Sequence, residues 1–149
     1  KPFKKEEYRT TQIPVVNDNT AAAPKFLQFM SEIFYSDPDK DDKVECILQM
    51  MGYTLMSHSQ REKFIMLIGN GANGKSVFLA VLEAVCGTGN IAGVQPSQFD
   101  RTFQRAELHN KLANIVTELS EGEKLADAEL KSITSGEPVT VEKSTKTHL

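Results

Sequence analysis

Apolar residues recur at helical spacing in two stretches of the first 63 positions. Over residues 25–35 they return every three or four positions, which predicts a helix with one buried face. An aspartate-rich turn over residues 36–42 follows, and Asp41 or Asp42 is expected to cap a second helix. Gly52 lies inside this second helix and could divide it into two. With an extended, proline-punctuated lead-in, these stretches predict a small helical subdomain at residues 1–63.

The pattern changes at residue 64. Residues 64–68 form a short continuous apolar run, which is typical of a strand buried on both faces. A glycine-rich turn follows, then an almost wholly apolar helix over residues 77–85 that Gly87 is expected to end. Strand, turn and buried helix in this order open an α/β unit, so residues 64–149 are expected to form an α/β domain.

Weaker patterns fill the rest of this domain. The remaining predicted elements are a loop at 87–97, a helix at 99–108, a second buried strand at 112–116, a short amphipathic helix at 125–133 and an extended segment from 139. Ser135 and Gly136 are expected to close the helix at 125–133.

Composition and charge narrow the class of protein. The chain has 149 residues, of which 40% are hydrophobic and 25% charged, as is usual for a globular domain with a packed core. No stretch approaches the roughly 18 apolar residues of a membrane span, and the basic start is not followed by a signal core. Cys46 and Cys86 lack CxxC spacing, so we expect a cytoplasmic protein without disulfides. The net charge of −3 indicates that any nucleic-acid contact is local.

The glycine-rich turn carries the strongest chemical signal. Residues 69–76 match the phosphate-binding pattern G-x-x-x-x-G-K-[ST] without deviation, between a predicted strand and a predicted helix. Glycines let successive backbone N–H groups point at phosphates, and the helix N-terminus adds to the positive field. Lys75 is expected to reach the β- and γ-phosphates of ATP, and Ser76 to hold Mg²⁺. The residues expected to bind the nucleotide are Gly69, Asn70, Gly71, Ala72, Asn73, Gly74, Lys75, Ser76 and Val77.

An acidic residue follows the second predicted strand. Glu118 is in the position where a Walker B acid supports Mg²⁺ or orients the attacking water. The candidate catalytic residues are therefore Lys75 and Glu118. The candidate metal ligands are Ser76 and Glu118. Glu121 is an alternative acid. Thr117 occupies the place where many P-loop enzymes have a first acid, which leaves open the side chain that supports the metal.

Taken together, these motifs resemble the superfamily 3 helicase domain of phage and plasmid primase-helicases. The resemblance rests on the Asn-Gly-Lys-Ser ending of the loop, on residues 112–121 and on the Ile-Thr-x-Gly within residues 130–143. Residues 52–55 are also similar to the Gly-Tyr-x-Leu that precedes the family's ATPase core. The resemblance implies a P-loop NTPase core of the AAA+-like type. This core is expected to be incomplete at its C-terminal side, because the family's sensor residue and arginine finger follow later.

The resemblance also implies a function. Family members are ATPases that form rings, usually hexamers, and translocate on single-stranded or forked DNA during phage, prophage or plasmid replication in the bacterial cell. Lys143 and Lys146 fall near the family's DNA-contacting hairpin and would contact phosphates, although Glu142 replaces the family's Arg. Without the later groups, we expect this chain alone to bind nucleotide weakly and to turn over little or none.

Two other interpretations stay open. The first is a small P-loop phosphotransferase acting on a nucleotide or metabolite, which needs an Arg-rich lid to which only Arg101 and Arg105 could contribute. The second is a nucleotide-sensing assembly module without motor activity, in which residues 1–63 make the assembly contacts. DNA-stimulated turnover separates the helicase from both.

Overall fold

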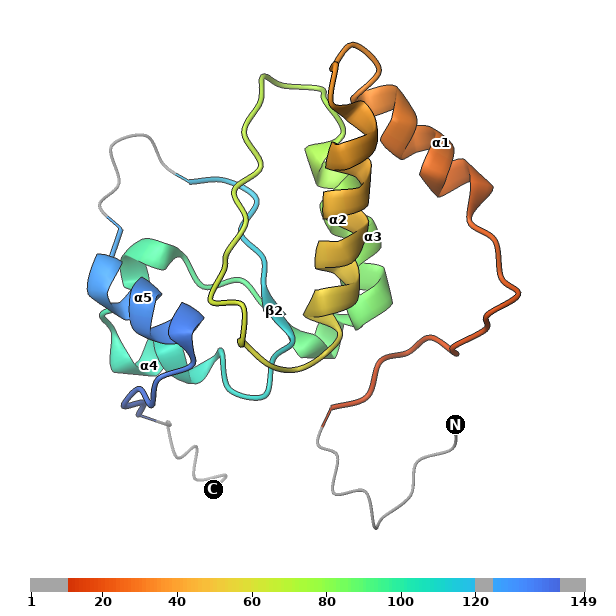
Figure 1. The fold of residues 1–149 in the computed structure, drawn as a ribbon. Helices are drawn as coiled ribbons and strands as arrows, with labels where there is room; N and C mark the ends of the chain where they lie inside the picture. Colours follow the sequence, from red (N-terminus) through yellow and green to blue (C-terminus); the bar gives the residue numbers. More distant parts are fainter. Residues whose placement is uncertain (1–10, 120–124, 143–149) are drawn as a thin grey trace.

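The protein is described by a computed structural model, which covers residues 11–119 and 125–142 (Figure 1). Its longer elements, in chain order, are α1 (Pro24–Ile33), α2 (Lys40–Thr54), α3 (Lys75–Cys86), β1 (Ile91–Ala92), α4 (Thr102–Ala106), β2 (Ala113–Asn114) and α5 (Asp127–Ser135). Short 3₁₀ helices at Thr88–Asn90 and Pro96–Gln98 lie on either side of β1. No helix among the described residues is both long and apolar enough to cross a membrane.

The helical subdomain is a hairpin of α1 and α2, which pack against each other. Both predicted helices are confirmed, and residues 11–23 contain neither helix nor strand. The expected division at Gly52 is wrong, because α2 runs through it without a break; one glycine costs a helix only about 1 kcal/mol relative to alanine. The expected cap is also wrong: Asp39 is the N-cap residue, and Asp41 and Asp42 lie in the first turn, where their charges favour the helix dipole.

The α/β part contains a small parallel sheet. Ile91 pairs with Ala113 and Ala92 with Asn114, so the predicted loop at 87–97 in fact contains a strand. The predicted strand at 112–116 is confirmed only over Ala113 and Asn114. Asn114 extends the pairing with its side chain, which accepts from the Val94 N–H and donates to the Val94 carbonyl, both at 2.8 Å. These two bonds continue the hydrogen-bond ladder beyond the paired residues. The predicted strand was expected to be buried on both faces, whereas Asn114 is exposed.

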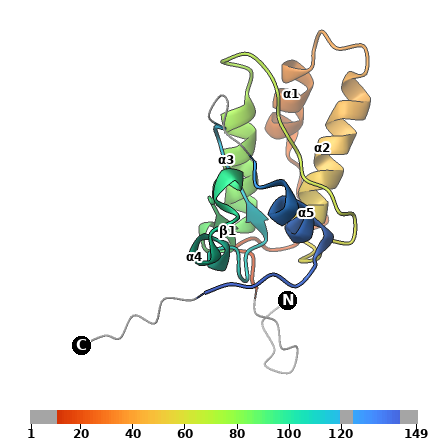
Figure 2. The same ribbon diagram turned by 90° about the vertical axis from the view of Figure 1, so that its left-hand side faces the viewer.

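Helix α3 runs opposite to β1 and β2. Figures 1 and 2 show that the chain descends through α3 and rises again through both strands, so the carboxyl ends of the strands and the N-terminus of α3 lie on one side. Ligands of α/β proteins bind on this side of a parallel sheet. The prediction that Gly87 ends α3 is confirmed, and Gly87 has the positive φ of 85° that glycine adopts most readily.

The apolar run at 64–68 does not form a strand. None of its backbone groups makes a hydrogen bond to the described residues, and all its side chains except the half-buried Leu67 are exposed, from 49% at Ile65 to 86% at Ile68. A strand exists only through bonds to a neighbour, and the two-stranded sheet does not reach this segment. The strand prediction is therefore wrong for the described structure.

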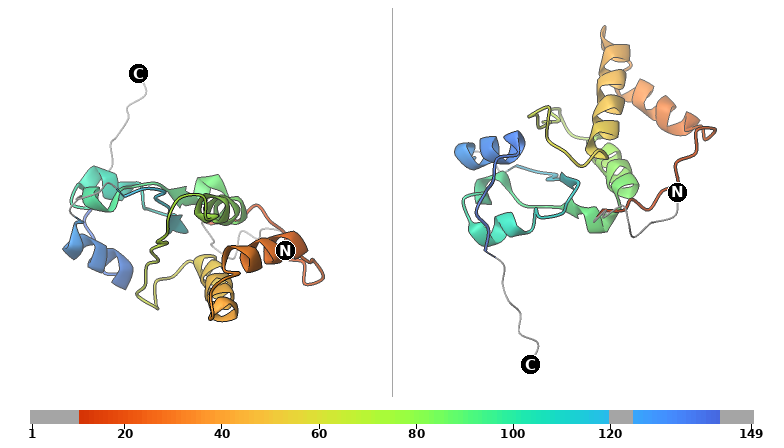
Figure 3. Two further views of the ribbon diagram at one scale, coloured as in Figure 1. Left: turned by 90° about the horizontal axis from the view of Figure 1, so that it is seen from above. Right: turned by 60° about the horizontal axis from the view of Figure 1, so that its bottom comes forward.

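Two small cores hold the elements together. Phe78, Leu82 and Cys86 form the buried face of α3, and Met30 of α1 is fully buried as well. On the other side of the strands, α5 packs Leu130 and Ile133 on the buried residues Ala92, Val94 and Phe99. Figure 3 shows this arrangement from above, with α4 and α5 separated from the α1–α2 hairpin by the strands and α3.

Helices α4 and α5 are close to their predictions. The helix expected at 99–108 is shorter, because only Thr102–Ala106 is α-helical. The helix expected at 125–133 is confirmed as α5, and Gly136 ends it with φ of 74° and an N–H bond to the Ile133 carbonyl at 3.3 Å. Residues 139–142 contain no regular element, in agreement with the extended segment expected there.

Candidate nucleotide-binding site

The amine of Lys75 turns back over the glycine-rich loop that precedes it. Its Nζ donates hydrogen bonds to the carbonyl of Gly69 at 2.8 Å, the carbonyl of Asn70 at 3.2 Å and the side-chain Oδ1 of Asn73 at 2.8 Å. An ammonium group has three N–H donors, so the loop satisfies all of them. The charge of Lys75 is thereby held at the centre of the segment that the sequence assigns to phosphate binding.

The backbone of this loop has the bends that an anion cradle requires. Ala72 and Gly74 have positive φ values of 60° and 81°. Residues in this left-handed region alternate with ordinary ones in turns whose successive N–H groups converge on an anion. A Cβ placed on Gly69 would overlap with the side-chain amide nitrogen of Asn73, so a larger residue there would displace the Asn73 side chain from the loop.

The N-terminus of α3 offers further donors. The Phe78 N–H bonds to the Gly74 carbonyl at 2.9 Å, and no side chain caps the helix. The N–H groups of Lys75, Ser76 and Val77 therefore have no acceptor within the helix, and they lie at the positive end of its dipole. Ser76 is exposed on this first turn. These donors, with Lys75, suit a polyphosphate.

Helix α1 supports the loop from the other side. A Cβ placed on Gly74 would lie 2.8 Å from Cγ2 of Ile33 and 3.0 Å from the ring of Phe29. The glycine thus allows both its positive φ and the close approach of α1. Helix α1 therefore lies directly against the N-cap residue of α3.

Glu118 follows the carboxyl end of β2 by four residues in the chain. It is exposed, and among the described residues no hydrogen bond or ion pair joins it to the glycine-rich loop. Lys75 and Ser76 are thus adjacent at the start of α3, whereas Glu118 comes from the segment that follows β2.

Gln95 is a polar residue near Glu118 that the sequence patterns missed. Its Nε2 donates to the Glu118 carbonyl at 3.3 Å, whereas its Oε1 is buried without a hydrogen-bond partner. Gln95 follows β1, which was expected to be loop. Recognition of Ile91 and Ala92 as a strand would have placed this amide at the strand end beside the candidate acid.

The donor set fits ATP with Mg²⁺. Backbone N–H groups and the Lys75 amine are the groups that cradle phosphates, and the Ser76 hydroxyl and the Glu118 carboxylate are oxygen ligands of the kind that Mg²⁺ prefers. Within the described residues, no group of three or more His, Cys, Asp or Glu side chains is gathered to hold a metal without a phosphate.

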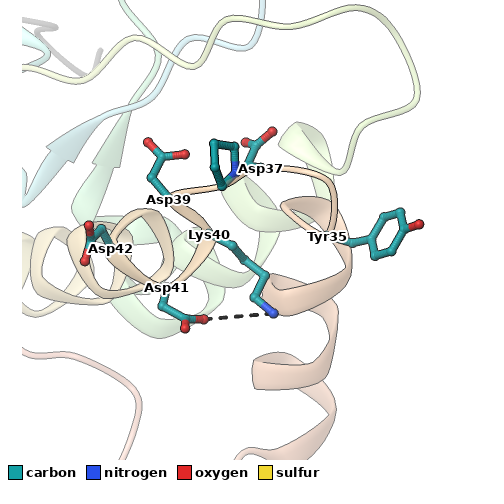
Figure 4. A pocket seen from close by; sticks show the side chains of 7 residues that line it. Tyr35, Asp37, Asp39, Lys40, Asp41 and Asp42 are labelled. Carbon is teal, nitrogen blue, oxygen red and sulfur yellow. Dashed lines mark ion pairs between the residues drawn. The ribbon is translucent and has the colours of Figure 1, made fainter.

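An acidic hollow at the turn between α1 and α2 is a second place of high charge (Figure 4). Its lining residues are Tyr35, Asp37, Pro38, Asp39, Lys40, Asp41 and Asp42. Three of these carboxylates are paired, because the amine of Lys43 lies 2.7 Å from Asp37 and 2.9 Å from Asp39, and the amine of Lys40 lies 3.9 Å from Asp41 (Figure 4). The hydrogen bond from Lys43 lowers the pKa of Asp39, and the two aspartates raise the pKa of Lys43. The turn is an ion-paired connection between helices.

Three candidate residues lie outside the described part of the chain. These are the alternative acid Glu121 and the expected DNA contacts Lys143 and Lys146.

Comparison with known proteins gives one family. Residues 67–148 match the model of DUF5906, a family of unknown function. No curated protein matches the chain.

Proposed function

Because the match to residues 67–148 spans more than half of the chain, the chain belongs to the DUF5906 family, and we propose that it is part of an ATP-dependent DNA helicase of the superfamily 3 type. The observation that carries the proposal is the loop at 69–76, which holds the Lys75 amine on three acceptors directly before an uncapped helix N-terminus. The proposed fold class is an α/β P-loop NTPase core preceded by the helical subdomain at 1–63.

Nucleotide binding would proceed by exchange of partners at the loop. The Lys75 amine leaves the carbonyls of Gly69 and Asn70 and takes up the β- and γ-phosphate oxygens, which are better acceptors because they are charged. The N–H groups of Ser76 and Val77 receive phosphate oxygens at the positive end of α3. The loop needs no new cation for this exchange.

Hydrolysis would use the strand ends. Ser76 and Glu118 are the residues that would hold Mg²⁺, which neutralises charge on the phosphates when it is bound. Glu118 acts on the attacking water through position rather than basicity. Gln95, bonded to the Glu118 carbonyl, keeps the main chain of the acid in place beside β1.

The remaining steps of the proposal come from the resemblance. The chain would work as part of a cytoplasmic ring, usually a hexamer, that moves along single-stranded DNA during replication of a phage or plasmid. Contacts to the DNA would come from Lys143 and Lys146, which follow the segment at 139–142.

The phosphotransferase interpretation is less well supported. It requires mobile arginines over the second substrate, and the guanidinium of Arg105 is already engaged with the backbone carbonyls of Phe99 and Thr140. Only Arg101 is then left for a lid among the two candidates.

The nucleotide-sensing module has one observation in its favour. Phe29 and Ile33 of α1 lie against Gly74, so a change in the loop on nucleotide binding would reach the helical hairpin directly. This contact suits a module that assembles in response to ATP, and it suits a motor equally.

The test is binding of a fluorescent ATP analogue, with Mg²⁺, to the 149-residue chain. The wild type is expected to bind and Lys75→Ala to bind at least roughly tenfold more weakly, since one charge-assisted phosphate contact is worth a factor of that order. Lys63→Ala, which removes an exposed lysine outside the loop, is the matched control and should bind like the wild type. Equal binding by the Lys75→Ala variant would refute the site.

The helicase itself is tested on the complete protein in which this chain occurs. Single-stranded DNA is expected to stimulate ATP hydrolysis, and Lys75→Ala to abolish that stimulation. Assembly with ATP but no DNA-dependent turnover would support the sensing module instead, and phosphate transfer to a small molecule would support the phosphotransferase.

A further inference from the structure

Two Asn-Gly pairs lie in the loop that precedes α3. They are Asn70-Gly71 and Asn73-Gly74. In such a pair the main-chain nitrogen of the glycine can attack the side-chain amide of the asparagine, because glycine has no Cβ to obstruct the approach. The reaction needs a side chain that turns freely and a following peptide unit that can rotate. The structure gives this freedom to one pair and withholds it from the other.

The first pair is free to react. Asn70 is exposed, and neither its side chain nor the N–H of Gly71 makes a hydrogen bond to the described residues. A Cβ built on Gly71 would meet nothing within 4 Å, so this part of the loop has open space around it. Rotation of the peptide unit would disturb the bond from Lys75 Nζ to the Asn70 carbonyl, which at 3.2 Å is the longest of the three that this amine donates.

The second pair is held at both of its residues. The Lys75 amine donates to Oδ1 of Asn73 at 2.8 Å, so a charged donor fixes the amide that would be attacked. Gly74 is the N-cap of α3 with φ of 81°, and the side chains of Ile33 and Phe29 lie against it. Rotation of this peptide unit would break the bond to Lys75 and disturb the start of the helix.

We propose that Asn70 is a site of spontaneous deamidation that ends in isoaspartate, and that the hydrogen bond from Lys75 protects Asn73. The Gly71 nitrogen forms a bond to Cγ of Asn70, and the side-chain nitrogen leaves as ammonia with the proton that Gly71 gives up, so that a cyclic succinimide results. Water then opens the ring. Where water adds to the main-chain carbonyl, the bond from that carbon to the Gly71 nitrogen breaks. The chain then continues through Cγ, and the former carbonyl is a free carboxylate.

The place of the new carboxylate follows from the geometry of the loop. The oxygen of the Asn70 carbonyl is the atom that accepts from the Lys75 amine at 3.2 Å. In isoaspartate the same carbon carries a full negative charge, so this hydrogen bond becomes an ion pair. Opening of the ring at the other carbonyl gives ordinary aspartate, whose charge is on the exposed side chain and not on the atom that Lys75 contacts.

Isoaspartate at position 70 thus occupies the amine that the proposed function assigns to phosphate. A charged internal acceptor competes with the nucleotide more strongly than the neutral carbonyl that it replaces. This inhibitory effect rests on the proposed function, whereas the modification itself does not. The loop therefore changes slowly, and without an enzyme, into a form that is closed to phosphate.

The first experiment incubates the 149-residue chain at pH 8 and follows both asparagines by peptide mass spectrometry, with isoaspartate distinguished from aspartate by electron-transfer fragmentation. Asn70 is expected to be converted mainly to isoaspartate. Asn73 should be converted at least roughly fivefold more slowly, since a hydrogen bond to a charged group contributes a factor of this order or more. In the chain unfolded by guanidinium chloride the two rates should be nearly equal, because both asparagines precede a glycine.

Two variants test the assigned causes. Gly71→Ala puts a methyl group beside the attacking nitrogen and should nearly stop the conversion of Asn70, while Asn73 is unaffected; the open space around Gly71 accommodates the methyl group. Lys75→Ala removes the donor to Asn73 and should raise its rate severalfold relative to that of Asn70. An unchanged ratio of the two rates in Lys75→Ala would refute the protection.

The second experiment measures binding of the fluorescent ATP analogue by the separated form that has isoaspartate at position 70. This form is expected to bind at least roughly tenfold more weakly than the unmodified chain, since it loses a charge-assisted phosphate contact. It should also bind more weakly than Asn70→Asp, which has the same charge on the side chain. The comparison separates the pairing with Lys75 from net charge.

The outcomes distinguish the modification from the proposed function. If Asn70 is not converted in the folded chain, or is converted no faster than Asn73, the modification site is refuted. If the isoaspartate form binds the analogue like the unmodified chain, the inhibitory pairing with Lys75 is refuted while the nucleotide site stands. If the unmodified chain does not bind the analogue, the nucleotide site and the inhibition are both refuted, and the two rates still decide the modification.

Discussion

The side-chain oxygen of Asn73 lies 2.8 Å from the amine of Lys75, two residues along the same loop. This contact places a neutral acceptor at the point where the proposed site would receive phosphate. The amide nitrogen of the same side chain lies over Gly69. Asn73 therefore closes the loop on itself, and a negative charge at this position would compete with phosphate for the lysine.

Asn73→Asp is expected to weaken binding of the ATP analogue about tenfold or more, because a carboxylate would pair with Lys75 and repel the phosphates. Asn70→Asp adds the same charge to the same loop but at a side chain that makes no hydrogen bond to the described residues, so its effect should be clearly smaller. Titration of both variants by fluorescence measures the difference. Equal losses would show that net charge alone matters, and that the contact with Lys75 does not.

Gly74→Ala is expected to lower the free energy of unfolding by about 2 kcal/mol or more, since it strains a residue with φ of 81° and forces a methyl group against Phe29 and Ile33. Gly71→Ala is the control, because a Cβ at that glycine meets nothing within 4 Å and its φ is not positive. Urea unfolding of the two variants gives the comparison. If Gly74→Ala and Gly71→Ala had equal free energies of unfolding, the packing of α1 on the loop would be contradicted.

Asn114→Ala removes both bonds to Val94 and leaves that residue's N–H and carbonyl without their partner. We expect a loss of about 1–3 kcal/mol, the usual cost of leaving such groups unsatisfied. Asn114→Asp keeps an acceptor for the Val94 N–H but sets a carboxylate oxygen against the Val94 carbonyl, so it should destabilise the protein as well. Chemical denaturation measures both, and a neutral Asn114→Ala would show that the side chain does not extend the sheet.

Acid should weaken the turn between α1 and α2. The pKa of Asp39 is lowered below its ordinary value of 3.8, first of all by the hydrogen bond from Lys43. The carboxylate therefore contributes stability above about pH 4, and that contribution is lost as the pH falls through the lowered pKa. Asp39→Asn should flatten the fall in melting temperature between pH 5 and pH 2 by a small amount, because the pair is exposed.

Lys43 responds at the other end of the pH scale. Its pKa is raised above the ordinary value of 10.5, mainly by Asp37 and then by Asp39. The stability that the charged Lys43 gives to the folded protein is therefore complete below that pH, and it is lost as the pH rises through the raised pKa. Asp41→Asn, which removes a carboxylate that does not contact Lys43, is the control for both ends. If Asp41→Asn reduced the fall in melting temperature between pH 5 and pH 2 as much as Asp39→Asn does, the pairing of Asp39 with Lys43 would be contradicted.

The two cysteines should differ in reactivity. Cys46 on α2 is exposed and Cys86 on α3 is fully buried, and burial raises the pKa of the Cys86 thiol. Because the thiolate is the reactive form, iodoacetamide at pH 8 should label Cys46 quickly and Cys86 only slowly. Mass spectrometry of the labelled peptides gives the two rates. Comparable rates in the folded protein would contradict the packing of α3.

Local sequence was sufficient where the cause of structure is local. The helix that contains the apolar spacing of α1 and the glycines that end α3 and α5 were predicted correctly, and the loop from Gly69 to Gly74 does precede a helix as predicted. Each depends on neighbouring residues in the chain: a helix bonds to itself, and a positive φ at Gly87 or Gly136 is a property of one residue. The candidate phosphate site belongs to this class.

Only the tertiary structure decided the features that depend on distant partners. The run at 64–68 has the composition of a buried strand but no neighbour within the described sheet, whereas the less apolar Ile91–Ala92 becomes a strand because Ala113–Asn114 lies beside it. The bonds of Arg105 to Thr140 and the contact of Phe29 with Gly74 join residues 35 or more positions apart, and no local pattern encodes them. The sequence by itself determined which groups are candidates for phosphate binding, and the tertiary structure decided what lies against them, because pairing and packing require a partner that the chain brings close only when it folds.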